Sequence, residues 1–306
     1  MNKNIFTFLF LNLSFLISFA QYPNTDIWLL DVNEDNGTIT FNNPVNITNR
    51  EGYDNQPAFS PDGKCILFSS LRENKQTDIY KYTIASKKTK RFCKTPESEF
   101  SPTFMPDGKY ISAVLIEKDS TQRLWKFPIK GGSGSIVMDK IDSVGYHCWI
   151  NENTLAFFIL TKPFTLQIAD VKTQQATVIA DSVSRCIKMI PERKAMSYTV
   201  KLNDTTFVIR QHQFQKTPLP SIFDSALLNY KAIGKSEDYI WYNQSTLIMA
   251  NGSLLYSSCI DCFGNGGSWK LIADLKQFGI DKIGRIAISA DKKKIALVTT
   301  VENSKK

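Results

Sequence analysis

The sequence predicts an all-β protein, a six-bladed β-propeller whose blades are four-stranded antiparallel sheets. Three observations lead to this prediction. A unit of apolar residue, turn and apolar strand recurs along the chain, no segment has the periodicity of an amphipathic helix, and the two chain ends supply complementary halves of one blade. Residues 21–306 are therefore expected to form one domain.

The repeated unit begins with an apolar residue and passes through a turn into a strand. Its clearest copies contain Pro-Asp-Gly, at Pro61–Gly63 and Pro106–Gly108. Pro presets its φ angle, Asp bonds to nearby backbone and Gly accepts positive φ, so this tripeptide is suited to joining two antiparallel strands. Successive copies lie about 40–50 residues apart, the length of a propeller blade. The six leading residues are Phe59, Phe104, Trp149, Met189, Trp241 and Ile288.

Further strands are expected after each pair. Short β-favouring segments separated by polar turns predict them. The predicted third strands include Asp78–Tyr82, Arg123–Phe127, Thr165–Ala169 and Thr206–Arg210, and the predicted fourth strands include Lys90–Lys94 and Thr177–Ala180.

The two ends of the domain are expected to share one blade. The domain begins with a third strand, Asp26–Leu30, and ends with a second strand, Ile295–Thr299. A blade built from both ends closes the ring and removes the exposed sheet edges that an open array would present.

The first twenty residues predict a cleavable signal peptide. Lys3 supplies a positive charge, Ile5–Phe19 is a mostly apolar run, and small residues at Ser18 and Ala20 suit cleavage after Ala20. A transmembrane anchor is the alternative, but the run is short for a bilayer span. We therefore expect a periplasmic or secreted protein with no transmembrane segment in the mature chain.

Composition and charge narrow the possible partners. The 306-residue chain is 42% hydrophobic and 22% charged, with a formal net charge of +8. This charge can favour anionic partners, but the lysines gather in short turn-like clusters. No helix-turn-helix or RNA-binding pattern is present, so a nucleic-acid partner is not expected. We expect a monomer.

The six cysteines predict at most a local disulfide. Cys65, Cys93, Cys148 and Cys186 fall in strand-like runs, where cysteine acts as a small apolar residue. Cys259 and Cys262 flank a two-residue spacer beside a glycine-rich loop, and a disulfide between them is predicted. A zinc site would need two more ligands, and the sequence has two histidines far from this pair. No metal and no cofactor are expected.

The paired turns and the Asp78-Ile79-Tyr80 that follows the first of them resemble the TolB-like, WD40-like (PD40) propeller repeats of exported bacterial proteins. The resemblance covers nearly all of residues 21–306 and implies the same propeller. TolB itself carries an α/β domain before its propeller, whereas only Gln21–Thr25 precede the first strand here, so that domain is expected to be lacking. The propeller also occurs in prolyl oligopeptidase-like enzymes, but no hydrolase domain or G-x-S-x-G motif is present.

Candidate binding residues come from the first strand of each blade. The leading residues are assigned to packing between blades. Because side chains alternate along a strand, the residues three positions earlier should lie on the opposite face, near the channel mouth. Four further candidates lie beside this column. The column is Gln56, Ser101, Tyr146, Cys186, Asp238 and Arg285, and its neighbours are Asn55, Glu97, Glu99 and Arg185.

Each charged candidate has a second interpretation. Glu97 and Glu99 could form an acid–base pair or a calcium site, or be solvated loop residues. Asp238 and Arg285 could form an ion pair between blades, or Arg285 could bind an anion. Arg185 could contact a ligand or brace its loop.

His147 is expected to be packed and hydrogen-bonded rather than catalytic. No catalytic residue is therefore assigned. The sequence favours an exported, non-catalytic module that binds a protein or glycan of the cell envelope at the channel mouth. The alternative is a hydrolase of sugar or ester bonds at the same mouth, using Glu99 and Asp238.

Overall fold

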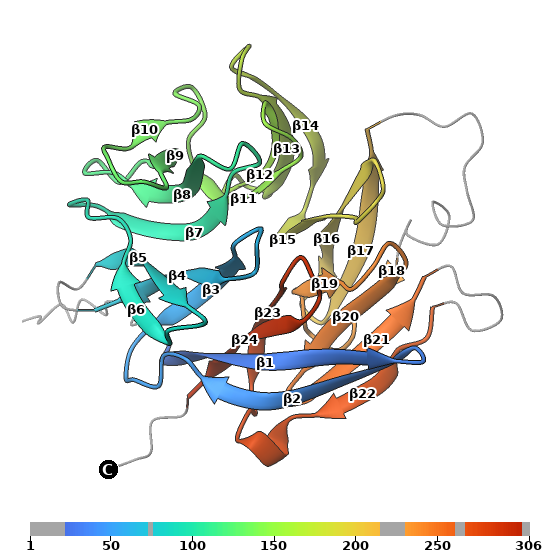
Figure 1. The fold of residues 1–306 in the computed structure, drawn as a ribbon. Coiled ribbons are helices and arrows are strands. Elements are labelled where there is room, and N and C mark those ends of the chain that lie inside the picture. Colours follow the sequence, from blue (N-terminus) through green and yellow to red (C-terminus); the bar gives the residue numbers. More distant parts are fainter. Residues whose placement is uncertain (1–21, 73–75, 215–229, 261–266, 302–306) are drawn as a thin grey trace, which may run out of the picture.

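A computed structural model describes residues 22–72, 76–214, 230–260 and 267–301. These residues form six four-stranded sheets arranged around a common centre (Figure 1). The innermost strand of each sheet lies against the innermost strand of the next around the whole ring. The prediction of an all-β, six-bladed propeller is confirmed.

Each of five blades is built from four consecutive strands, and the innermost strand comes first in the sequence. The outermost strands of these blades differ in length. The first blade along the chain contains β3 (Asp54–Phe59), β4 (Cys65–Leu71), β5 (Thr77–Thr83) and β6 (Lys88–Arg91), and the second contains β7 (Ser98–Phe104), β8 (Tyr110–Ile116), β9 (Gln122–Pro128) and β10 (Ser135–Ile136). The third contains β11 (Val144–Trp149), β12 (Thr154–Ile159), β13 (Thr165–Asp170) and β14 (Gln175–Asp181), and the fourth contains β15 (Val183–Met189), β16 (Ala195–Asn203), β17 (Thr206–Gln213) and β18 (Tyr230–Lys231). The fifth contains β19 (Tyr239–Trp241), β20 (Thr246–Asn251), β21 (Leu254–Cys259) and β22 (Lys270–Asp274). A 3₁₀ turn, η1 (Lys276–Phe278), follows β22.

The sixth blade joins the two ends of the domain. Its order from the inside is β23 (Ile283–Ile288), β24 (Lys294–Thr300), β1 (Thr25–Asp35) and β2 (Thr38–Asn46). β1 pairs antiparallel with β24 from Thr25 opposite Thr300 to Asp31 opposite Lys294. This is the predicted ring closure, with the inner two strands from one end of the chain and the outer two from the other.

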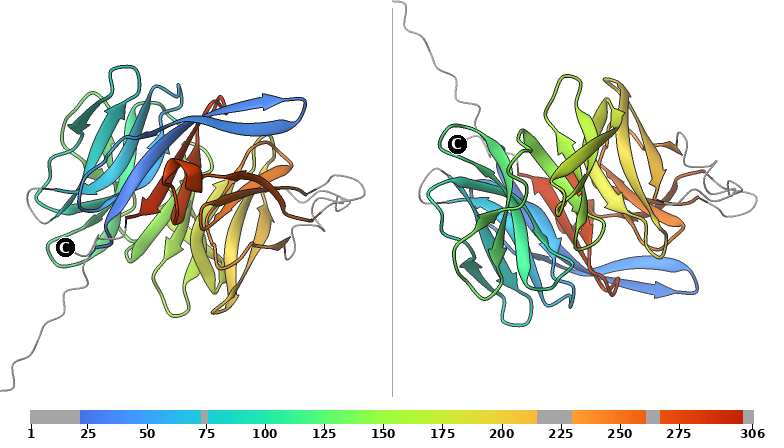
Figure 2. Two further views of the ribbon diagram at one scale, coloured as in Figure 1. Left: turned by 90° about the horizontal axis from the view of Figure 1, so that it is seen from below. Right: turned by 90° about the horizontal axis from the view of Figure 1, so that it is seen from above.

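The β1–β2 hairpin also covers the neighbouring blade. Both views in Figure 2 show it extending along the β19–β22 sheet. Its apolar side chains, among them Val32 and Phe41, join a buried cluster with Ile248 and Leu255 of that sheet. The Tyr242 hydroxyl donates a hydrogen bond to Glu34 across the same junction, at 2.8 Å. The hairpin therefore fastens two blades as well as completing one.

The predicted Pro-Asp-Gly turns are present. In the first, the Gly63 amide donates to the Ser60 carbonyl oxygen at 2.9 Å, and Asp62 accepts hydrogen bonds from the Ser60 hydroxyl and the Lys64 amide. Gly63 and Gly108 have φ angles of 67° and 65°, which glycine adopts without strain. These two turns determine where β3 and β7 end, and so determine which residues of these strands face the centre of the ring.

The core lies between the blades. The described residues contain six buried hydrophobic clusters, one at each junction between neighbouring blades. Each second strand is covered on both faces by adjacent blades, so it is apolar over most of its length; β4 and β8 each have five consecutive buried residues. The polar residues of the innermost strands are left to line the centre.

The cysteines divide as the sequence predicts. Cys65, Cys93, Cys148 and Cys186 are free thiols, two of them buried and two half-buried. Cys259 is disulfide-bonded; its predicted partner, Cys262, lies outside the described residues, as does the predicted signal peptide. In the described part of the chain, no helix has both the length and the apolar character needed to span a bilayer.

Candidate functional site

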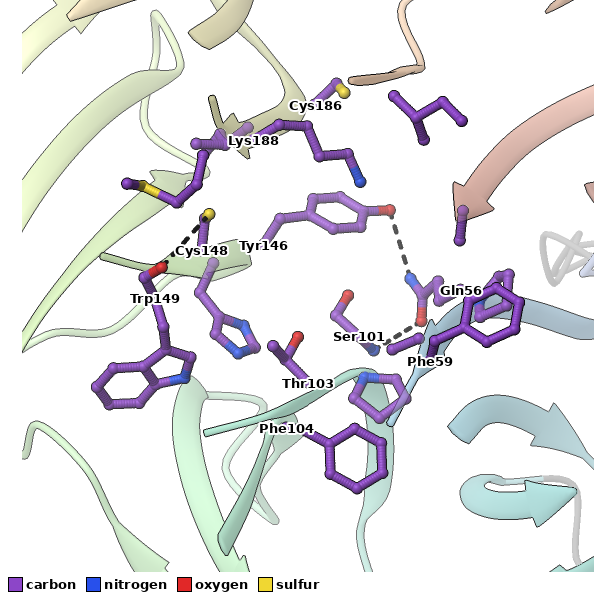
Figure 3. Close-up of a pocket in the computed structure, with 18 of the residues that line it drawn as sticks. Gln56, Phe59, Ser101, Thr103, Phe104, Tyr146, Cys148, Trp149, Cys186 and Lys188 are labelled. Carbon is purple, nitrogen blue, oxygen red and sulfur yellow. Dashed lines mark hydrogen bonds between the residues drawn. The ribbon is translucent and has the colours of Figure 1, made fainter. Parts of the chain in front are cut away.

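A cavity of 740 Å³ occupies the centre of the ring, where all six blades meet. Its wall comes from the second half of each innermost strand: residues 56–59, 101–104, 146–149, 185–189, 240–241 and 285–288, together with Asp238 just before β19. Figure 3 shows Gln56, Tyr146 and Lys188 pointing into this space from three different strands.

The predicted column lines this cavity. All six of its members contribute to the wall, and so does the neighbouring Arg185: the six are Gln56, Ser101, Tyr146, Cys186, Asp238 and Arg285. Asn55, Glu97 and Glu99 do not contribute. The sequence therefore predicted seven of the residues that meet at the centre, and the binding role assigned to them stays a prediction.

The alternation argument behind the column was partly wrong. The leading residues, such as Phe59 and Phe104, were expected to face away from the channel, yet they border it while also packing between blades. The cause is an irregularity in the pairing of five innermost strands, β3, β7, β11, β15 and β23, with their second strands. Gln56 and Ser101 lie in two of these bulges, with φ angles of 58° and 52°. A bulge re-aims the side chains that follow it.

One side of the wall is neutral and internally bonded. The Gln56 side-chain oxygen accepts hydrogen bonds from the Ser69 hydroxyl at 2.8 Å and the Ser101 amide at 2.7 Å. Its Nε2 donates to the Tyr146 hydroxyl at 3.4 Å. Gln56 thus links three blades and holds the bulge of β7 in place. The Ser101 hydroxyl itself is buried without a hydrogen-bond partner among the described residues.

The opposite side of the wall carries charge. Arg285 Nη1 lies 3.7 Å from Asp238 Oδ2, so the predicted ion pair between blades is present. Arg285 also donates a hydrogen bond to the Tyr146 hydroxyl at 2.5 Å, with its guanidinium carbon 5.0 Å from the centre of that ring. Three innermost strands are tied together by this group.

Arg185 braces a loop. Its Nε lies 2.9 Å from Glu237 Oε1, and its Nη2 donates to the Gly284 carbonyl oxygen at 3.3 Å. Glu237 belongs to the next blade and Gly284 to the blade after it, and the positive charge of Arg185 is already matched by the carboxylate of Glu237. The bracing interpretation fits these contacts, although the side chain also lines the cavity.

Lys188 is the main residue of the wall that the sequence reasoning missed. It lies on β15, half-buried, and its ammonium makes no hydrogen bond or ion pair with the described residues. Burial acts to lower the pKa of Lys188, but nearby groups, among them the carboxylate of Asp238, outweigh it and the net shift is upward, so the side chain is charged at neutral pH. The repeat itself contains a signal that singles out Lys188. Lys188 lies one position before a leading residue, where the other copies have Ala58, Thr103, Cys148, Ile240 and Ala287.

His147 is packed and hydrogen-bonded, as expected. Its Nε2 lies 2.7 Å from the Ser112 hydroxyl of the preceding blade, and burial lowers its pKa to about 3. Tyr239, at the matching position of β19, bonds in the same way to Ser197 at 2.7 Å. This position therefore serves to join blades. Burial also raises the pKa of the Cys148 and Cys186 thiols, which lowers their reactivity as nucleophiles.

Glu97 and Glu99 do not form a site with Asp238. Glu99 is fully buried between blades, where its carboxylate accepts hydrogen bonds from the Ile79 amide at 3.0 Å and the Thr95 hydroxyl at 2.7 Å. Burial raises its pKa to about 7. Glu97 is half-buried and bonds through its carbonyl oxygen to Gln76 and Thr95. The solvated-loop interpretation is wrong for Glu99, because the side chain lies ahead of the β7 bulge and points between blades.

The described residues contain no group of three or more His, Cys, Asp or Glu side chains placed to hold a metal ion. The calcium site considered for Glu97 and Glu99 therefore has no set of ligands in this part of the chain.

No model of a known protein family and no curated protein matches the chain. Solved structures do. A putative TolB from Agrobacterium tumefaciens matches 92% of this chain and 100% of its own, with a TM-score of 0.60 and 11% identity. The fold is that of a TolB-like six-bladed β-propeller.

Other solved structures share the TolB-like propeller fold. An oligogalacturonate lyase from Vibrio parahaemolyticus matches 90% of this chain and 87% of its own, with a TM-score of 0.52 and 13% identity. An oligogalacturonate lyase in complex with manganese matches 90% and 86%, with a TM-score of 0.51 and 12% identity. At these identities the likeness concerns the fold, which hosts both TolB and an enzyme, so function must be argued from the cavity.

Proposed function

We propose that this protein is an exported, non-catalytic binding protein whose small polar ligand, a glycan or the end of a protein partner in the cell envelope, lies in the central cavity. The observation that carries the proposal is the wall of that cavity. It combines three cationic side chains, Arg185, Lys188 and Arg285, with neutral hydrogen-bonding groups in a space of 740 Å³, a volume within the range of about 300–1,000 Å³ usual for small-molecule sites.

Unused hydrogen-bonding groups support a ligand in this place. The Ser101 hydroxyl and His147 Nδ1 are buried and have no hydrogen-bond partner among the described residues, and both residues line the cavity. Buried polar atoms are normally paired with protein, water or ligand. A polar molecule in the cavity would provide these missing partners.

The ring of Tyr146 in the cavity wall suits a sugar-like ligand, and two further rings, those of Phe158 and Phe164, pack behind it. Phe164 is 46% exposed and stacks on Phe158 with ring centres 5.1 Å apart. Phe158 in turn lies 5.9 Å from the ring of Tyr146, in the cavity wall. Aromatic rings offer apolar faces at little cost in conformational entropy.

A binding role fits the wall better than hydrolysis does. Glycoside hydrolysis commonly uses two carboxyl groups flanking the bond, and Asp238 is the single carboxylate among the described residues of the wall. Glu99, its supposed partner, lies between blades. The alternative, an enzyme acting on sugar or ester bonds, would have to work with Asp238 alone, and its charge is held by Arg285.

A blocked cavity tests the proposal. The mature chain is screened against glycan and metabolite panels, and any saturable binder is measured again with Ala287→Phe, which places a ring in the wall. Thr173→Phe adds the same ring on an exposed turn and is the control. We expect Ala287→Phe to abolish binding and Thr173→Phe to retain it. The proposal fails if broad panels yield no saturable binder, or if the blocked variant binds as well as the wild type.

Export and oligomeric state are tested directly. Expression of the full chain in a Gram-negative host, followed by N-terminal sequencing of the periplasmic product, is expected to give a chain beginning at Gln21. Light scattering on that product is expected to give the mass of a monomer. Retention of residues 1–20 in the cytoplasm would contradict the proposed export.

A further inference from the structure

We propose that the cavity binds a single anionic group, the carboxylate or phosphate of a small molecule, through Lys188, with Tyr146 as the second donor. This inference rests on the proposed function and specifies its ligand. It follows from the number of charged groups in the wall, from the partial burial of Lys188 and from the hydrogen bonds of Tyr146.

The charges of the wall do not balance. Arg185 is paired with Glu237 at 2.9 Å, and Arg285 with Asp238 at 3.7 Å. Lys188 is the remaining cation of the described wall, and no carboxylate lies within ion-pairing distance of its ammonium. Both carboxylates near it are already engaged by arginines. One positive charge therefore remains uncompensated at the centre of the ring.

A partly buried ammonium is best stabilised by an anion in direct contact with it, and Lys188 has the attraction of Asp238 without such a contact. Lys188 is half-buried within the ring rather than on the outer surface, and Figure 3 shows its side chain reaching into the cavity beside Cys186. Among the described residues, this ammonium makes no hydrogen bond and no ion pair. An anion entering the cavity would supply the missing opposite charge.

Tyr146 supplies a second donor. Its hydroxyl oxygen accepts hydrogen bonds from Arg285 Nη2 at 2.5 Å and from Gln56 Nε2 at 3.4 Å. With the oxygen occupied by two donors, the hydroxyl proton is free to donate to another group. The two incoming bonds also hold the ring in place, so the donor is oriented before any ligand arrives.

The same balance sets the charge of the ligand. One uncompensated cation neutralises one negative charge, and Asp238 would repel a second. A carboxylate matches this count, whereas a phosphate monoester, with a charge of about −1.5 to −2 at pH 7, exceeds it in part. Carboxylates and phosphate esters offer the same acceptor oxygens to an ammonium and a phenol, so the source of the anion has to be distinguished by experiment.

Calorimetry with three sugars of similar size tests the inference. Glucuronate carries a carboxylate, glucose 6-phosphate carries a phosphate, and glucose is their neutral counterpart. We expect one or both charged sugars to bind the mature wild-type protein at least 10-fold more tightly than glucose. Lys188→Met should weaken that charged sugar by roughly 10-fold or more while leaving glucose unchanged.

Lys172→Met is the matched control, because it removes the same charge from an exposed turn outside the cavity. This control should retain the affinity of the wild type. Thermal unfolding supplies a second readout: Lys188→Met should melt close to the temperature of the wild type, because the removed ammonium makes no hydrogen bond or ion pair with the described residues of the free protein.

Three outcomes overturn the inference: equal binding of glucose and the charged sugars, equal loss in both lysine variants, or a marked fall in the melting temperature of Lys188→Met. The last would show that Lys188 serves the fold. A neutral ligand that binds in the cavity independently of Lys188 would also overturn this inference, yet it would leave the proposed function standing.

Discussion

Two carboxylates at similar positions in two different blades, Glu99 and Asp238, have different surroundings. Glu99 lies ahead of the bulge in β7, fully buried between blades, and its partners are the neutral amide of Ile79 and the hydroxyl of Thr95. Asp238 lies just before β19 in the cavity wall, and its partner is the guanidinium of Arg285. The first joins blades, and the second belongs to the charged wall of the cavity.

The difference follows from position in the repeat: Glu99 lies two residues before Ser101, the residue that corresponds to Asp238. A residue ahead of the bulge points into the junction between blades, and a residue at the bulge or after it turns towards the channel. Asp54 occupies the place in β3 that Glu99 occupies in β7, and it too is fully buried, bonded to Ser70 and Arg50. Acids at this position therefore contribute to the junctions, whatever the cavity binds.

The sharpest test of this comparison is the pH dependence of Glu99. Its folded-state pKa is raised from 4.5 to about 7, so between these values the folded protein binds more protons than the unfolded chain. Stability contributed by the protonated group is present below about pH 4.5 and is lost as the pH rises to about 7, a change of about 3 kcal/mol.

Urea unfolding of the wild type and Glu99→Gln at pH 5 and pH 8 measures this effect. The free energy of unfolding of the variant, relative to the wild type, should rise by about 3 kcal/mol between the two pH values. Glu97→Gln, two residues away and half-buried, makes the same chemical change and is the comparison variant. If the difference in free energy of unfolding between Glu99→Gln and the wild type were the same at both pH values, burial would not raise the pKa of Glu99 as described.

The second prediction concerns the charged partner of Asp238. Arg285→Met leaves that carboxylate in the wall without its ion pair, so we expect a loss of about 2 kcal/mol. Asp238→Asn combined with Arg285→Met should cost less than the sum of the single changes, by about 1 kcal/mol. Urea unfolding of the four proteins measures this coupling.

The exposed ion pair of Lys201 and Asp204, at 2.9 Å, is a suitable comparison for that cycle. Its coupling should be below about 0.5 kcal/mol, because both groups remain hydrated. Equal coupling in the two pairs would show that the wall of the cavity is as well solvated as the outer surface.

The smallest effect is expected on the neutral side of the wall. Gln56→Ala removes an acceptor from the Ser101 amide and the Ser69 hydroxyl, and water in the cavity can replace it in part. We expect a loss of about 1 kcal/mol in the free energy of unfolding. Gln56→Glu keeps the acceptor, so its free energy of unfolding should fall by less than that of Gln56→Ala. A larger fall in Gln56→Glu would mean that a negative charge at this position costs more than the lost hydrogen bonds.

Most of the fold could be predicted from the sequence because each blade repeats one local solution. The turns at Pro61–Gly63 and Pro106–Gly108 fix where two strands meet, and the apolar second strands follow from their burial on both faces. Ring closure by Asp26–Leu30 and Ile295–Thr299 needed only a count of strands. These features depend on neighbours in sequence, which a single chain displays.

The cavity could be predicted in part. Strict alternation of side chains placed Gln56 and Ser101 near the centre, but it assumed regular pairing. Positive φ angles at these two residues are set by contacts between blades, including the bond from the Ser101 amide to Gln56. Those contacts join residues 45 positions apart, so no local pattern reveals them. The same gap explains why Glu99 was assigned to an exposed loop, and why Lys188, a lone charge among small and apolar residues, was overlooked.

The pairing that closes the ring also determines how the ring would come apart under load. Thr25 and Thr300 are opposite one another at the same end of the β1–β24 ladder, and Asp31 and Lys294, which form an ion pair, are at the far end. Tension applied between the two strands at Thr25 and Thr300 would break their hydrogen bonds in succession, like a zipper, instead of shearing all of them at once. Tension at these two residues therefore opens the closure one hydrogen bond at a time, and the Asp31–Lys294 pair is the last contact in that ladder to part.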